Sequence, residues 1–137
     1  MHRIACTLTA IAVLAGAACN QVSTTESKLV GDWSMPRGEV TDRGVIGDHG
    51  YTITSLKADH TFSQTAYPVE APPARVFAGT WSIEGDQLVM IFTWTHPTMR
   101  DVLGQELRFV ISELMPDRVV LVNAQNQKHK FVQTRVR

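Results

Sequence analysis

Cysteine is scarce in this sequence, and neither sign of charge dominates it. The 137 residues include two cysteines, and 13 basic residues are balanced by 13 acidic ones. Nucleic-acid binding and polybasic membrane patches both need clustered Lys and Arg, so the balance argues against either. A chain of this length holds one domain at most.

Short catalytic motifs are also absent. The sequence has no Gly-x-Ser-x-Gly, no His-x-x-x-His and no phosphate-binding loop. We therefore expect no enzyme activity and no cofactor. His49 and His96, which fall in long loops, leave open a metal site completed by Asp48 or Asp101, but no short-spaced pair of ligands supports it. We expect no metal ion.

The amino-terminal residues have the pattern of a secretory leader. Arg3 is followed by an uncharged run of twelve residues, 7–18. That run is too short to cross a bilayer core of about 30 Å as a helix, but it suits the apolar segment of a signal peptide. The sequence predicts a signal peptide over residues 1–18.

The leader ends in small residues directly before a cysteine. Ala17-Ala18-Cys19 resembles the lipobox of bacterial lipoproteins, with Gly16 where Leu is usual. The alternative is an ordinary signal peptide in which Cys19 is incidental. Cys6 leaves with the leader, so Cys19 has no disulfide partner in an exported chain. We expect lipid on Cys19 to be the chain's contact with a membrane.

Asn20 follows the cysteine that we expect to carry the lipid. In Gram-negative lipoproteins Asp at this position retains the protein at the inner membrane, so the resemblance implies the outer membrane, facing the periplasm. Residues 19–28 are predicted to carry the lipid and form a flexible polar tether, and residues 29–137 to form the domain.

From residue 29 onward, runs of β-branched and aromatic residues alternate with turn residues. No stretch sustains a period near 3.6, and many short strands with close turn signals indicate a sandwich or barrel. We predict eight strands, at residues 29–34, 51–57, 61–65, 75–84, 87–95, 106–114, 118–123 and 128–136.

One hairpin can be placed in register. Gly85-Asp86 fits a type II′ turn, with Gly at the first central position. Directly opposed residues share a face. The turn therefore predicts one apolar face, which we take as the barrel interior: Phe77, Trp81, Ile83, Leu88, Met90, Phe92 and Trp94. Our candidate ligand-binding residues on this face are Phe77, Trp81, Met90, Phe92 and Trp94. Ala58-Asp59-His60 fits a three-residue loop whose last residue is left-handed, and Pro116-Asp117 fits another turn.

Three segments resemble the small lipocalin-like lipoproteins of bacteria. Gly31-Asp32-Trp33 matches the Gly-x-Trp motif of lipocalins, and residues 56–62 and 79–88 are similar to the turn-flanking segments of those lipoproteins. The resemblance covers residues 29 to about 136 and implies an all-β, eight-stranded antiparallel up-and-down barrel. It also implies that a last-strand arginine, Arg135, stacks over Trp33.

In such a barrel, alternate connections lie at opposite ends. The connections after the second, fourth and sixth strands are short, so the long ones gather at one end, the mouth. Long loops on a rigid barrel commonly carry binding groups. We expect a small apolar or amphipathic ligand at the mouth. The alternative is a periplasmic interaction protein, such as a protease inhibitor or envelope accessory factor, with a filled core.

Overall fold

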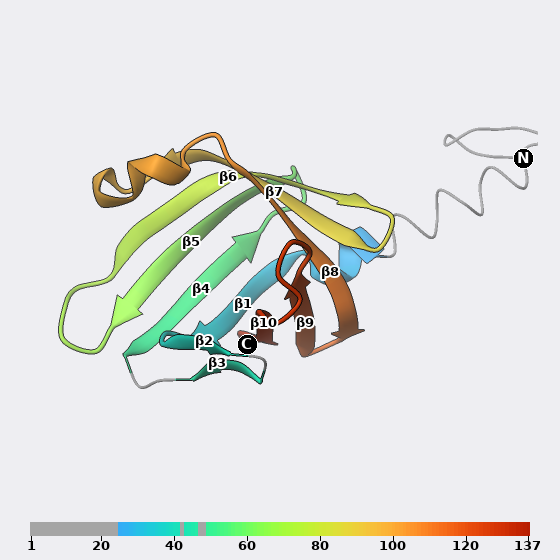
Figure 1. The fold of residues 1–137 in the computed structure, drawn as a ribbon, viewed down its shortest axis with the longest axis horizontal. Coiled ribbons are helices and arrows are strands. Elements are labelled where there is room, and N and C mark those ends of the chain that lie inside the picture. The colour runs from blue at the N-terminus through green and yellow to red at the C-terminus, as the bar shows by residue number, and fades with distance from the viewer. Residues whose placement is uncertain (1–24, 42, 47–48) are drawn as a thin grey trace, which may run out of the picture.

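A computed structural model describes residues 25–41, 43–46 and 49–137, with side chains for all of these except 39–41 and 45–46. Eight strands close into an antiparallel barrel (Figure 1). Around the barrel they follow the chain order, so the predicted up-and-down fold is confirmed. The strands are β1 (Gly31–Pro36), β4 (Gly50–Leu56), β5 (Thr61–Pro68), β6 (Ala74–Glu84), β7 (Gln87–Thr95), β8 (Glu106–Met115), β9 (Arg118–Asn123) and β10 (Lys130–Arg135).

The loops hold structure that the sequence did not reveal. β2 (Glu39–Thr41) and β3 (Gly44–Ile46) form a small hairpin in the connection from β1 to β4. The 3₁₀ helix η1 (Pro97–Val102) follows β7, with Pro97 starting it and the His96 side chain accepting from the Thr98 amide. Both lie at the mouth end, opposite the tight turns (Figure 1).

The predicted tether is too long at its carboxyl end. Residues 25–29 are helical, and Leu29 is buried at 1% exposure. The carboxylate of Glu26 lies 2.9 Å from the His60 ring nitrogen, which ties the helix to the β4–β5 turn. Residues 25–28, assigned to the flexible tether, are therefore packed on the base of the barrel.

The turn residues behave as their chemistry predicts. His60 is left-handed (φ 68°), the one non-glycine residue with positive φ among those described. Asp59 accepts from both the amide and the hydroxyl of Thr61, and these two bonds lower the pKa of its carboxyl group. In the β6–β7 turn only Gly85 has positive φ, as a type II′ turn requires.

The β6–β7 register agrees with the sequence as far as Gly79, which lies opposite Phe92. There the register shifts: Ala78 lies opposite Trp94, and Thr93 has no partner on β6. An extra residue of this kind reverses the side chains that follow it. Trp94 is consequently 37% exposed on the outer face, with the Arg75 guanidinium 4.5 Å above its ring. The prediction that Trp94 faces the interior is wrong.

The base of the barrel is closed around Trp33. Its indole is 1% exposed and donates to the Leu29 carbonyl at 2.8 Å. The Arg135 guanidinium lies 4.3 Å from the centre of the indole ring, where the lipocalin resemblance places it. Gly31 has φ +140°, and a Cβ there would clash with the Arg135 guanidinium. Glycine in the Gly-x-Trp motif is thus required twice, for its backbone angle and for its missing side chain.

Trp81 completes the base on the other side. Its indole donates to the Lys57 carbonyl at 3.0 Å, and its backbone amide donates to the His60 carbonyl at 2.8 Å. The His60 ring meets the indole edge to face, 5.1 Å between ring centres. At 2% exposure, Trp81 links β6 to the β4–β5 turn.

Replacing Trp81 with Ala should lower the free energy of unfolding by about 3–5 kcal/mol, because a fully buried indole is lost and a cavity remains. Thr80→Ala, on the exposed outer face of the same strand, should cost far less. Urea unfolding of the two variants measures the difference, and equal losses would contradict the register.

Replacing Arg135 with Met keeps much of the side-chain length but removes the charge over Trp33. We expect a loss of about 2–4 kcal/mol, from the cation–π contact and the hydrogen bonds to backbone carbonyls. Arg118→Met is the control, because Arg118 forms an exposed ion pair with Glu113 that is worth under about 1 kcal/mol. A loss at Arg135 no larger than at Arg118 would show that the stacked arginine does not hold the base.

Candidate functional site

A cavity of about 220 Å³ occupies the barrel interior above the base. Every barrel strand contributes to its lining, together with one residue of the amino-terminal helix. The lining consists of Leu29, Trp33, Met35, Thr54, Leu56, Phe62, Gln64, Phe77, Leu88, Met90, Phe92, Leu107, Phe109, Val119, Leu121, Phe131 and Gln133.

Half of the cavity wall is entirely apolar. β6, β7, β8 and β9 contribute only aliphatic, aromatic and methionine side chains to it. Phe77 and Phe92 stack at 4.6 Å between ring centres, and Phe109 meets Phe131 of β10 edge to face at 5.6 Å. These rings give the wall flat surfaces that suit a planar or aliphatic body.

The other half, on β10, β1, β4 and β5, carries the polar side chains. Gln64 donates its amide to the Thr54 hydroxyl at 3.0 Å. Gln133 is 9% exposed and faces the cavity from β10. Thr52, two residues before Thr54, has a buried hydroxyl with no partner among the described residues, although it does not itself line the cavity. The cavity therefore has an amphipathic wall with no charged side chain among the described residues that line it.

The structure divides the seven predicted interior residues into groups. Phe77, Leu88, Met90 and Phe92 line the cavity, and Ile83 packs against the core without lining it. Trp81 is buried but sits in the base, beside the smaller hollow between the amino-terminal helix and the β4–β5 turn. Trp94 lies outside, as described above.

Sequence reasoning missed Thr54, Gln64 and Gln133, although one signal for Gln133 was present. Residues two apart on a strand point to the same face. If Arg135 points inward over Trp33, then Gln133 also points inward. A polar residue in an interior position of a strand is a binding-site signal, which the alternation of apolar residues alone does not show.

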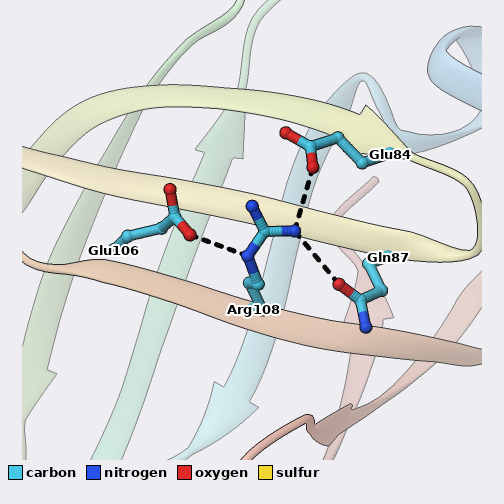
Figure 2. Close-up of polar contacts among 4 residues, drawn as sticks. All are labelled: Glu84, Gln87, Glu106 and Arg108. Atoms are coloured by element: carbon cyan, nitrogen blue, oxygen red, sulfur yellow. Dashed lines mark hydrogen bonds and ion pairs between the residues drawn. The ribbon is translucent and has the colours of Figure 1, made fainter.

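The outer wall holds a polar cluster of a different kind (Figure 2). Arg108 donates to Glu106 at 2.7 Å, to Glu84 at 2.9 Å and to the Gln87 side chain at 3.2 Å. The two carboxylates raise the pKa of the guanidinium. The cluster links β6, β7 and β8, and Arg108 has partners on three sides, so it braces the sheet and leaves no open site.

The mouth is rimmed by exposed charged residues of both signs. Arg43, Glu70, Arg75, Arg100 and Asp101 are exposed there, and His49 and His96 lie in the same rim. No group of three or more His, Cys, Asp or Glu side chains gathers to hold a metal ion in the described part of the chain. Glu39, Asp42 and Asp48 belong to the connection from β1 to β4, and their side chains lie outside the described residues.

The predicted signal peptide and Cys19 also lie outside the described residues. Within residues 25–41, 43–46 and 49–137, no helix is both long and apolar enough to span a bilayer.

No protein-family model matches the sequence, and a search of curated proteins finds no match. Solved structures do match. A lipocalin-like protein from Bacteroides uniformis aligns at a TM-score of 0.61 and 15% identity, over 80% of this chain and 99% of that one. An uncharacterized protein from Bacteroides eggerthii aligns at a TM-score of 0.56 and 14% identity, over 78% of this chain and 98% of that one. At this identity the likeness shows the fold, and the domain is a lipocalin-like β-barrel.

Proposed function

We propose that this chain is a lipid-anchored binding protein that takes one small apolar or amphipathic molecule into its barrel from the mouth. The observation that carries the proposal is the interior cavity of about 220 Å³. An eight-stranded barrel is just wide enough either to be filled by its own side chains or to hold one small ligand. Here Met90 and Phe92 line space that they do not fill.

The size and lining of the cavity support binding. The space of about 220 Å³ is bordered mostly by apolar side chains. Water inside it finds few hydrogen-bonding partners, so an apolar body that displaces this water would bind favourably. The alternative, a protease inhibitor or envelope accessory factor with a filled core, has no such support.

Entry from the mouth follows from the closed base. Leu29, Trp33 and Trp81 block the other end, each at 2% exposure or less. The chain enters β1 from the base, where residues 25–29 pack (Figure 1). A lipid on Cys19 would then hold the base toward the outer membrane and leave the mouth facing the periplasm.

Filling the cavity should abolish binding. We expect Met90→Trp to weaken the affinity for naphthalene at least tenfold, because the indole takes the space of the ligand. Ile91→Trp makes the same addition on the outer face, where Ile91 is 37% exposed, and should change affinity less than twofold. Equilibrium dialysis measures both, with Cys19→Ser in every sample so that no acyl chain competes for the cavity.

Overpacking can destabilise a core by about 1–3 kcal/mol, so thermal unfolding should establish that both tryptophan variants are folded. Leu107→Phe, a smaller addition on the cavity wall, provides a second test. Unchanged naphthalene binding by folded Met90→Trp and Leu107→Phe would reject the cavity as the site.

The lipid anchor is tested separately. Cys19→Ser should lose incorporation of labelled palmitate and move from the membrane fraction to the soluble fraction, because serine offers no thiol to acylate. Cys6→Ser, the matched change within the leader, should keep both the label and the membrane location. Palmitate label retained by Cys19→Ser would contradict the assignment.

A further inference from the structure

We infer that the cavity selects an uncharged ligand with an apolar body and one hydrogen-bonding group, and that Gln133 binds that group. The inference rests on the proposed function and names the chemical class of its ligand. It begins from a buried amide on β10 that lines the cavity.

Gln133 is an unusual residue for this position. It is 91% buried and it lines the cavity. Among the described residues, the one buried side-chain atom that lacks a partner is the Thr52 hydroxyl, so the Gln133 amide is reached from the space of the cavity. A primary amide offers two donors and an acceptor that need partners when removed from water. Buried polar groups in folded proteins are generally hydrogen-bonded. The Gln133 amide is therefore placed to bond with what occupies the cavity.

A second polar pair lies on the same half of the wall. β1 alone separates β10 from β4, which carries Thr54 and is paired with β5 and Gln64. The Gln64 amide donates one N–H to the Thr54 hydroxyl at 3.0 Å, which leaves its second N–H and its carbonyl oxygen for a ligand. If the polar group of a ligand faces β10, β4 and β5, its apolar body contacts the Phe77 and Phe92 rings on the opposite wall.

Charge is excluded by the same lining. No Lys, Arg, His, Asp or Glu among the described residues contributes to it. Arg135, on the last inward position of β10, is engaged by the carbonyls of Lys28, Val30 and Pro116 and by the Trp33 ring. An ionised carboxylate would lose its water without gaining a cation, which is strongly unfavourable. The ligand class is thus neutral: an alcohol, phenol, carbonyl or amide, and no fatty-acid-like anion.

The cavity also limits size. An apolar cavity of about 150 Å³ takes up one benzene molecule, and this one measures about 220 Å³. A molecule of one or two fused rings matches that space. Naphthalene, 2-naphthol and 2-naphthoate share one ring system and differ only in the group presented to Gln133.

The test compares these three compounds by equilibrium dialysis at pH 7, where 2-naphthol is neutral. The protein is the full chain with Cys19→Ser, with and without Gln133→Leu. We expect the affinity of 2-naphthol relative to naphthalene to fall about threefold to tenfold in Gln133→Leu, the value of one hydrogen bond. In the unsubstituted cavity 2-naphthoate should bind at least a hundredfold more weakly than 2-naphthol.

Gln133→Leu should fold at least as stably as the parent, since it replaces a buried amide with an apolar group of similar size. Gln125→Leu, in the exposed β9–β10 loop, is the matched control and should leave all three affinities unchanged. If naphthalene binds but Gln133→Leu leaves the ratio of 2-naphthol affinity to naphthalene affinity unchanged, the inference is overturned and the proposed function stands. The inference is also overturned, and the proposed function again stands, if 2-naphthoate binds most tightly of the three compounds. No binding of any compound would overturn both.

Discussion

Closure of this barrel depends on the seam between β1 and β10, which is the shortest of its strand pairings. β1 and β10 share two paired positions, Trp33 with Arg135 and Ser34 with Thr134, whereas β1 and β4 share six. A seam so short has few ladder hydrogen bonds. The Arg135 side chain supplements them, because it lies flat on Trp33 and donates to three backbone carbonyls from the chain before β1 and from the β8–β9 turn.

That closure divides the interior into a packed floor and a space above it. Leu29, Trp33 and Trp81 form the floor, each nearly inaccessible to solvent. The long connections, including the β2–β3 hairpin and η1, are all at the opposite end (Figure 1). Between them the wall is apolar on β6 to β9 and carries its polar side chains on β4, β5 and β10. The rigid part of the molecule thus presents an asymmetric surface to anything that enters.

The sequence predicted the elements whose cause is local. Gly85 and the left-handed His60 define their turns through backbone chemistry alone, and eight alternating runs became eight strands. The residues that line the cavity were harder to predict from the sequence. The face of the sheet on which a side chain lies depends on every residue between it and the nearest turn. Trp94 was misplaced by one bulge, and Gln133 was overlooked because a polar residue in a strand normally faces solvent.

The unpaired Thr93 has a consequence for the capacity of the barrel. If Thr93 instead took a partner on β6, the alternation would continue beyond Phe92, and Trp94 would turn from the surface into the barrel. An indole would then occupy part of the space that the cavity now holds. Loss of Thr93 would have no such effect, because Trp94 would then follow Phe92 directly and keep its outward place opposite Ala78. The capacity of the barrel is therefore governed by how β7 pairs with β6 as well as by the size of the residues that line it.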